Sequence, residues 1–578
     1  MDALRRKPVF ATGQGDTTYL GWADILILLS IAAAVYLGVQ LASSAPASLA
    51  RAEIDLNPQV LPYYALQSVG RMAAAYVLSV LFSLVYGYMA ARSRSAERVL
   101  LPVLDVLQSV PILSFLPVVV LGLTAVLPQA TAVEMAAIVL IFTSQVWNMT
   151  YSFYQSLRTL PRELREAASV FRFNWWWRFR RMELPFAAIG LLWNSMMSWA
   201  GGWFFLMAAE IFTVGDKDFR LPGVGSYLQE AANANDTTAI LWGVLTLVLI
   251  VVLLDQLVWR PLLVWVEKFK IETVENDNPP TSWFYTLLSG SRLANWLNQV
   301  LVVGVIKALD RRLGKARRFE PAESDRPLHW TQHTARFLAL LIFVLIVIAL
   351  SVELARLLLS VPLDNYGRIV AGTVATALRV LAAMLIAMGW TIPLGVIIGS
   401  SPRLANILQP LVQIAASIPA TAFFPLIVLA IVSSGGSLNV AAVLLMLLGT
   451  QWYILFNVIA GASAIPKDLR DMTDLMRFKG GSRWRKLILP SLFPYLITGL
   501  ITASGGAWNA SIVAEYTEFG QQTYDVIGLG ALISEATANG DFALLTAATL
   551  TMILVVVCIN RYFWRRLYRL AEEKYRME

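Results

Sequence analysis

Long apolar runs alternate with short polar segments along most of the 578-residue chain. A helix of about 20 apolar residues crosses a bilayer, and twelve runs in the sequence reach that length. They lie near 22–42, 64–91, 99–123, 132–157, 184–211, 238–262, 336–359, 368–399, 403–432, 438–461, 489–515 and 541–563. This pattern predicts an all-α polytopic membrane protein with twelve transmembrane helices, six on each side of a polar central segment.

Two polar loops within this pattern repeat each other. Residues 160–168 read LPRELREAA and residues 465–473 read IPKDLRDMT. In each copy 19 residues separate an acidic residue, Glu166 or Asp471, from the proline of a following Leu-Pro pair. Further matches at the same offset of 305 residues are Trp147 with Trp452, Trp203 with Trp508, and Glu210 with Glu515. Six spans in each half give both halves the same orientation, as in parallel repeats related by an axis along the membrane normal.

The charge of the loops predicts which side each one faces. Residues 158–183 and 467–486 each carry seven basic residues against three acidic ones. Lys and Arg are in excess in cytoplasmic loops, so these two loops and both termini are expected in the cytoplasm. Loops 212–237 and 516–540 then face outward, and their glycine-rich turns suit a compact re-entrant or cap element.

Composition excludes several classes of function. Hydrophobic residues make up 57% of the chain and charged residues 15%, which excludes disorder and fits a membrane protein. One cysteine and two histidines are too few for a disulfide framework, a zinc site or a haem site. The net charge of +8 comes from the loops expected in the cytoplasm and does not indicate nucleic-acid binding. The nucleotide-binding pattern Gly-x-x-x-x-Gly-Lys-Ser/Thr does not occur, so we expect a transport subunit rather than an enzyme.

The repeated loop resembles the coupling loop in the permease subunits of binding-protein-dependent ABC importers. In that family a Glu-Ala-Ala triplet precedes a glycine and, further on, a Leu-Pro pair. Glu166-Ala167-Ala168 with Leu184-Pro185 match this motif closely. The second copy, Asp471-Met472-Thr473 with Leu489-Pro490, matches only in spacing and charge. Arg172 and Arg477 stand where the family has glycine, a departure in both copies.

Short motifs beside the spans are similar to those of the nitrate, sulfonate, taurine and bicarbonate branch of this family. They are Ser68-Val69-Gly70-Arg71, Thr376-Ala377-Leu378-Arg379, Ser109-Val110-Pro111, Ser417-Ile418-Pro419, Ala209-Glu210 and Ala514-Glu515. The resemblance implies a type I ABC importer-like fold in which two six-helix permease domains are fused in one chain.

The resemblance and the spans together divide the chain into five segments. These are a cytoplasmic N-terminus (1–20), a first permease domain (21–266), a cytoplasmic linker (267–335), a second permease domain (336–566) and a cytoplasmic tail (567–578). An apolar face near 292–313 indicates either an amphipathic helix on the inner membrane surface or a solvated linker with one packed helix.

The resemblance implies that each repeated loop forms a coupling helix that docks on a separate ATPase subunit, and that the two ATPase subunits bind ATP and Mg. Acidic residues near a helix start are favoured by the helix dipole. The expected coupling residues are Arg162, Glu163, Arg165, Glu166, Ala167, Ala168, Lys467, Asp468, Arg470 and Asp471. The alternative is an ordinary helix on the membrane surface. The other expected partner is an extracytoplasmic solute-binding protein. The chain itself is expected to be a multi-pass protein of the bacterial cytoplasmic (inner) membrane.

Ionisable residues inside spans are candidates for function because burying them in a membrane is costly. Arg71 and Arg379 enter from the outer side, where Glu210 and Glu515 end their spans. We interpret them as two symmetric ion pairs, Arg71 with Glu210 and Arg379 with Glu515. The alternative is that the arginines attract an anion at the outer mouth.

Proline pairs mark a candidate substrate path. Pro111, Pro117, Pro419 and Pro425 are expected to break or kink their helices, freeing backbone N–H groups for an anion. The candidate path residues are Ser109, Gln145, Trp147, Asn148, Trp203, Ser417, Gln451, Trp452, Trp508 and Asn509. For each of them, packing or hydrogen bonding between helices is the alternative.

The sequence thus predicts the permease of an ABC importer for a small anion of the nitrate, sulfonate, taurine or bicarbonate type. A secondary transporter with two parallel six-span halves explains the repeat but not the two matching loops. An ABC importer of a different small solute is the other alternative.

Overall fold

The computed structural model of the chain describes most of both halves. Described are residues 29, 53–109, 112–214, 217–234, 236–269, 282–291, 304, 307, 310, 345–346, 348–463, 465, 469, 472–473, 475–478, 480–519 and 522–574. The expected span 22–42 lies outside these residues except for Leu29, and the expected span 336–359 is described continuously only from residue 348.

The first half is a group of helices with one β-hairpin. Its elements are η1 (Pro58–Val60), α2 (Leu61–Arg92), α3 (Arg94–Ser109), η2 (Ile112–Phe115), α4 (Leu116–Thr124), α5 (Gln129–Thr159), α6 (Arg162–Val170), α7 (Trp175–Arg178), η3 (Phe179–Glu183), α8 (Leu184–Glu210), β1 (Ile211–Val214), β2 (Lys217–Arg220), α9 (Val224–Asn233), α10 (Thr237–Leu254), η4 (Asp255–Trp259), α11 (Arg260–Val266) and η5 (Glu267–Phe269). Helix α12 (Trp283–Gly290) follows in the linker.

The second half repeats this order. Its elements are α16 (Leu363–Ser400), α17 (Pro402–Ser417), α18 (Ala420–Ser433), α19 (Leu438–Ser463), α21 (Gly481–Arg483), η7 (Trp484–Ile488), α22 (Leu489–Ala514), β3 (Tyr516–Phe519), β4 (Gln522–Asp525), α23 (Leu529–Ala538), α24 (Phe542–Cys558), η8 (Ile559–Trp564) and α25 (Arg565–Lys574). The offset of 305 residues holds for the backbone, since β1 and β3, β2 and β4, α9 and α23, and the π-helical turns η3 and η7 all begin 305 residues apart.

Seven helices among the described residues are long and apolar enough to cross a membrane. The expected spans 99–123 and 403–432 are not single helices, because α3 is followed by η2 and α4, and α17 ends before α18 begins. Pro419 lies at the second break, where a proline cannot donate the N–H that would continue the helix. The outward loops, expected as cap elements, each contain an antiparallel hairpin followed by a short helix.

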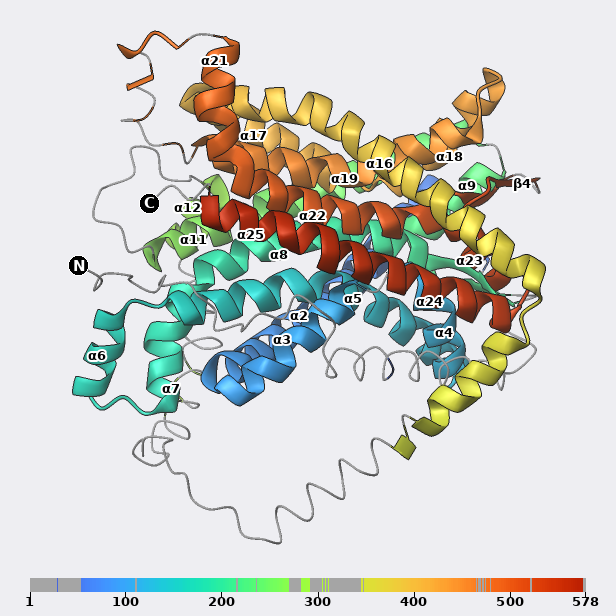
Figure 1. The fold of residues 1–578 in the computed structure, drawn as a ribbon, viewed down its shortest axis with the longest axis horizontal. Coiled ribbons are helices and arrows are strands. Elements are labelled where there is room, and N and C mark those ends of the chain that lie inside the picture. Colours follow the sequence, from blue (N-terminus) through green and yellow to red (C-terminus); the bar gives the residue numbers. More distant parts are fainter. Residues whose placement is uncertain are drawn as a thin grey trace, which may run out of the picture.

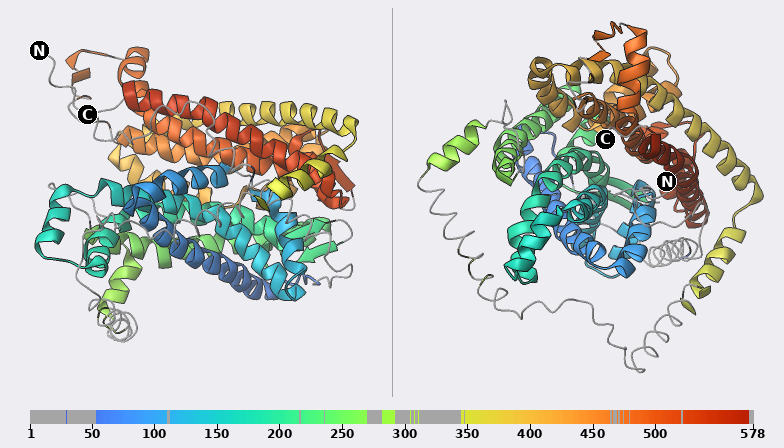
Figure 2. Two further views of the ribbon diagram at one scale, coloured as in Figure 1. Left: turned by 60° about the horizontal axis from the view of Figure 1, so that its bottom comes forward. Right: turned by 60° about the vertical axis from the view of Figure 1, so that its left-hand side comes forward.

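The long helices run roughly along one direction (Figure 1). Helices α6, α7 and α21 lie at one end of the molecule, and α9, α23 and the hairpins lie at the other. Within each half α2 packs on α5 and α5 on α8, as α16 packs on α19 and α19 on α22. Figure 2 shows the first half, blue to green, beside the second half, yellow to red. The halves contact each other reciprocally, α10 with α17 and α3 with α24, around one buried apolar cluster.

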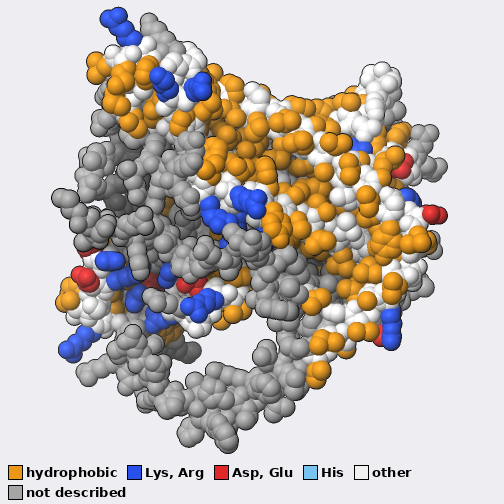
Figure 3. Space-filling view, in the orientation of Figure 1, with side chains coloured by type: hydrophobic (Ala, Val, Ile, Leu, Met, Phe, Trp, Pro, Cys, Tyr) orange, Lys and Arg blue, Asp and Glu red, His pale blue; other side chains and the backbone are white. Residues whose placement is uncertain are grey.

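The outer face of the long helices is apolar (Figure 3). On α16, Val370, Val374, Leu378, Leu381 and Leu385 are all exposed and follow each other at helical spacing. A continuous exposed apolar stripe of this kind is costly in water and is the surface that a lipid bilayer covers. Basic side chains gather near the end that carries α6.

Candidate coupling surface, outer ion pairs and central cavity

The first repeated loop folds into the expected short helix, α6. Its charged residues Arg162, Glu163 and Glu166 are exposed. Ala168 is buried against Leu160 and Met182, which fixes one face of α6 to the rest of the loop. Arg165 donates to the carbonyl groups of residues 157 and 158, so it ties α6 to the end of α5. The helix therefore presents charged side chains of both signs outward on a fixed base.

Arg172, at the position of the family's glycine, has a left-handed backbone with φ of 50°. The N–H of Phe173 donates to the carbonyl of Ala168 and the N–H of Arg172 to that of Ser169, both at 3.0 Å. This is the Schellman pattern, which needs a left-handed residue after the helix and is usually met by glycine. Arg477 repeats it in the second copy with φ of 54°. Both departures from the family motif thus occupy strained positions.

We expect Arg172→Gly to stabilise this loop by about 1 kcal/mol, because glycine has no Cβ to oppose a left-handed backbone. Hydrogen exchange of the amides around residue 172 should slow by roughly fivefold. Arg172→Ala is the control, because it also removes the charge but keeps the Cβ. Equal slowing in the alanine variant would attribute the effect to charge and not to the backbone.

The second loop is described only in part. Lys467, Asp468, Arg470 and Asp471, expected to contact an ATPase, lie outside the described residues. Leu475 and Met476 are described, and 84% and 57% of their surfaces are exposed. They lie 305 residues after Val170 and Phe171, which are 76% and 72% exposed. Both loops therefore contain an exposed apolar pair, at 170–171 and at 475–476, and we call these pairs the apolar tips.

The linker contacts the first loop. Asp310 accepts a hydrogen bond from Trp176 Nε1 at 2.9 Å and pairs with Arg180. The hydrogen bond from Arg180 holds the pKa of Asp310 below its usual range. Residues 304, 307 and 310 are helical; the rest of the predicted helix near 292–313 lies outside the described residues.

Arg71 and Glu210 form a buried ion pair at the outer end of the first half, with Nη1 and Oε1 2.8 Å apart. Glu210 also accepts from Ser68 Oγ at 2.6 Å and from the N–H of Gly225 at 2.7 Å. Arg71 makes a second, two-point contact with Glu134, at 2.7 Å for each bond. The carboxylate of Glu210 thus joins α2, α8 and the start of α9.

Arg379 and Glu515 form the equivalent pair in the second half, 2.7 Å apart. Glu515 accepts from Thr376 Oγ1 at 2.8 Å and from the N–H of Gly530 at 2.9 Å. Asn439 takes the place of Glu134, so Arg379 has one carboxylate partner where Arg71 has two. All four residues lie within networks that hold the cap helices α9 and α23, and these networks occupy the arginine donors.

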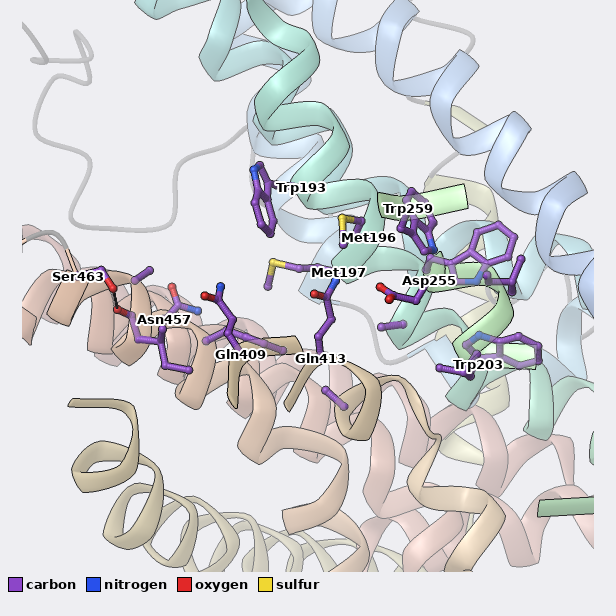
Figure 4. A pocket seen from close by; sticks show the side chains of 18 residues that line it. Trp193, Met196, Met197, Trp203, Asp255, Trp259, Gln409, Gln413, Asn457 and Ser463 are labelled. Atoms are coloured by element: carbon purple, nitrogen blue, oxygen red, sulfur yellow. Dashed lines mark hydrogen bonds between the residues drawn. The ribbon is translucent and has the colours of Figure 1, made fainter. Parts of the chain in front are cut away.

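A cavity of about 480 Å³ lies between the two halves (Figure 4). The first half supplies one wall from α8 and η4, with Trp193, Trp199, Trp203, Asp255 and Trp259. The second half supplies the facing wall from α17 and α19, with Gln409, Gln413, Asn457 and Ser463. A smaller cavity of about 80 Å³, lined in part by Trp452, shares Met197 and Phe456 with the first.

Most of the candidate path residues lie elsewhere. Trp203 lines the large cavity and Trp452 the small one. Gln145 is buried beside Met72, Trp508 is in the core, and Asn509 accepts a hydrogen bond from the N–H of Ile112 in the other half at 2.5 Å. Three further candidates line neither cavity, namely Trp147, Asn148 and Gln451. Ser109 and Ser417 end α3 and α17, and their side chains lie outside the described part of the chain.

Sequence reasoning missed Asp255 and Glu134, although each is an ionisable residue inside an expected span. That signal was sufficient to find them. It also missed Gln409 and Gln413, which carry no charge and are distinguished only by their place on the cavity wall.

Permeases of other organisms are similar to parts of this chain. The bicarbonate transport system permease protein CmpB of Synechococcus elongatus is 28% identical over 214 residues, 36% of this chain and 74% of that protein. The nitrate import permease protein NrtB of Leptolyngbya laminosa is 28% identical over 186 residues, 32% of this chain and 63% of that protein. SsuC of Bacillus subtilis, named for aliphatic sulfonate transport, is 26% identical over 276 residues, 46% of this chain and 92% of that protein.

The family described as binding-protein-dependent transport system inner membrane component matches residues 58–258 and residues 391–570. The two matches cover more than half of the chain and fall one in each half. They agree with the two loops, the repeated backbone and the interface between the halves. The chain therefore belongs to this family, as a multi-pass inner-membrane permease component in which the family's unit occurs twice.

Proposed function

We propose that the chain forms the translocation path of an ABC importer and couples it to two separate ATPase subunits by alternating access. The observation that carries this proposal is the cavity between the halves, together with two exposed loops at one end of the molecule. A relative movement of the two halves changes such a cavity directly, because each half supplies one of its walls.

The two loops are the proposed ATPase contacts. In the first, the exposed charged residues of α6 and the apolar tip offer charge and apolar surface to a partner. The chain lacks the nucleotide-binding pattern, so ATP and Mg are assigned to the partner subunits. The loops and both termini are placed in the cytoplasm, and a solute-binding protein is placed at the end with the hairpins.

The cavity is displaced toward the end with α6. Ser463 is the last residue of α19 before the second loop, and Trp193 lies in the half of α8 that follows the first loop. We therefore assign this conformation to the cytoplasm-facing state of the transport cycle. The relatives are named for bicarbonate, nitrate and sulfonate transport, which favours a small solute of these classes.

The test is reconstitution of the full chain in liposomes with an ABC ATPase subunit of the same organism. Uptake of labelled nitrate, bicarbonate and taurine is measured with ATP and with a non-hydrolysable ATP analogue. We expect the ATPase to copurify with the chain and uptake to require ATP hydrolysis. Uptake driven by an ion gradient without any ATPase would instead establish a secondary transporter.

A further inference from the structure

The charge of the central cavity is unfavourable for a bare inorganic anion. Among the residues found to line it there is no lysine, arginine or histidine, and Asp255 is the one ionisable side chain. A small anion leaving water needs positive charge or several converging N–H donors. On the side of the first half, a nitrate or bicarbonate ion in this cavity would instead face the carboxylate of Asp255.

The size and wall of the cavity suit an organic molecule. Its volume of about 480 Å³ falls within the range of roughly 300–1,000 Å³ typical of organic ligand sites. Trp199 and Trp259 line it with their ring centroids 5.8 Å apart, and Tyr76 packs on both rings. Met196 and Met197 add thioether surface, which adapts to irregular apolar shapes.

One carboxylate oxygen in the wall is available to a ligand. Arg260 and Gln256 both donate to Oδ2 of Asp255, each at 2.9 Å, and no hydrogen bond to Oδ1 is found among the described residues. The side chain of Asp255 points into the cavity toward Gln413 (Figure 4). Trp199 is 8% exposed, and within the described part of the chain its Nε1 has no hydrogen-bond partner. The open acceptor, Asp255 Oδ1, matches a ligand that donates a hydrogen bond, whereas Trp199 Nε1, unpaired among the described residues, is buried out of a ligand's reach.

This wall is specific to the first half. At the positions 305 residues later, serine replaces Trp199 (Ser504), asparagine replaces Asp255 (Asn560) and threonine replaces Trp193 (Thr498). Residues with packing roles persist at the same offset, such as Trp203 with Trp508 and Glu210 with Glu515. The second half forms the same fold without these aromatic and acidic residues. The fold itself therefore does not require them.

We propose that this cavity binds an organic solute with an aromatic or aliphatic body and an N–H group that donates to Asp255 Oδ1, and that it does not bind bare inorganic oxyanions. The proposal rests on the transport function proposed above, because it takes the cavity to be the path of the solute. It replaces the class of small anions, for which the relatives are named, with organic molecules that carry an N–H group.

The test is binding to the full chain in lipid nanodiscs, measured by saturation-transfer NMR at millimolar probe concentration. The probes are benzylamine, which has a ring and an N–H group, benzenesulfonate, which has a ring and a negative charge, and nitrate, which has the negative charge alone. We expect benzylamine to bind, benzenesulfonate to bind about tenfold more weakly, and nitrate not to bind. Asp255→Asn should lower the affinity for benzylamine by about tenfold. Asparagine fits this turn, since Asn560 occupies the equivalent position in the second half. Trp242→Leu, on the exposed face of α10, is the control and should change nothing.

If Asp255→Asn does not fold, Gln413→Glu replaces it, since a second carboxylate in the cavity should strengthen benzylamine binding. The proposal would be overturned if nitrate competed with benzylamine, or if neither substitution changed the affinity for benzylamine. It would also be overturned if no probe bound. A different result would overturn the proposed transport function alone. Benzylamine would then bind as expected, while no ATPase associates with the chain and no ATP-driven uptake occurs.

Discussion

Replacing Glu515 with alanine is expected to lower the free energy of unfolding by about 3–5 kcal/mol, the usual cost of removing one partner of a buried ion pair. Glu515 is fully buried, and among the described residues its loss leaves Arg379 with only the amide oxygen of Asn439 and the carbonyl of Ile527 as acceptors. The N–H of Gly530 and the hydroxyl of Thr376 lose the same carboxylate. Thermal and denaturant unfolding of the purified full chain in detergent measures the effect.

Glu210→Ala is expected to cost less, about 2 kcal/mol, although Glu210 is just as buried. The difference arises because Arg71 still has both oxygens of Glu134 after the substitution. Its positive charge therefore stays compensated, and the loss is mainly that of hydrogen bonds to Ser68 and Gly225.

The two halves provide a matched control for this prediction. Glu134→Asn gives the first half the pattern of the second and should have a small effect alone, since Glu134 is 39% exposed. In that background Glu210→Ala should become as costly as Glu515→Ala. Glu535→Ala, which breaks an exposed pair with Arg368, should cost less than about 1 kcal/mol. Equal losses for Glu210→Ala with and without Glu134 would refute the compensation by Glu134.

Val170→Asp is expected to reduce ATP-driven uptake by roughly 30-fold or more, the effect of losing an interface hot spot of about 2 kcal/mol. Val170 is exposed in the free chain, so a charge there should leave folding intact. In the proposed complex the same charge would be buried against the ATPase without a partner, which is costly. Copurification of the ATPase with the variant and uptake in liposomes give the two readouts.

Val126→Asp is the matched control, because Val126 is equally exposed but lies between α4 and α5, at the opposite end of α5 from α6. Leu475→Asp makes the same change in the second apolar tip. Similar losses at 170 and 475 would show that both ATPase contacts are needed to the same extent. Undiminished uptake and normal ATPase association in both variants would refute the coupling role of these loops.

Most of the fold could be predicted from hydropathy and from the repeat, because both are local or periodic properties of the chain. The helices α2, α5, α8, α16, α19 and α22 lie where apolar runs of span length occur. The prediction failed where one run contains two helices, as at α17 and α18, since hydropathy does not register a break in the backbone. It was also silent on the hairpins, whose four-residue strands are too short to show alternation.

The candidate site was predictable only in part. The ion pairs Arg71 with Glu210 and Arg379 with Glu515 followed from charge inside apolar runs, where an ionised group requires a partner. The cavity wall did not follow, because its two sides come from α8 with η4 and from α17 with α19, far apart in the sequence. Polar residues in spans are common in packing contacts, and Gln145 and Asn509 are examples.

By itself the sequence determined the membrane class, the duplication and the two repeated loops, since each of these follows from composition or spacing. It also showed that Arg172 and Arg477 stand where the family has glycine, but their strained left-handed backbone came only from the structure. The tertiary structure decided which side chains meet across the halves, and so which face the cavity. The physical reason is that the hydrophobic effect, which sets the spans, is non-directional and can be read from local composition. Hydrogen bonds and cavity walls depend instead on distances between particular atoms. Asp255 illustrates this, as it is one more charge in a span until the fold sets it opposite Gln413.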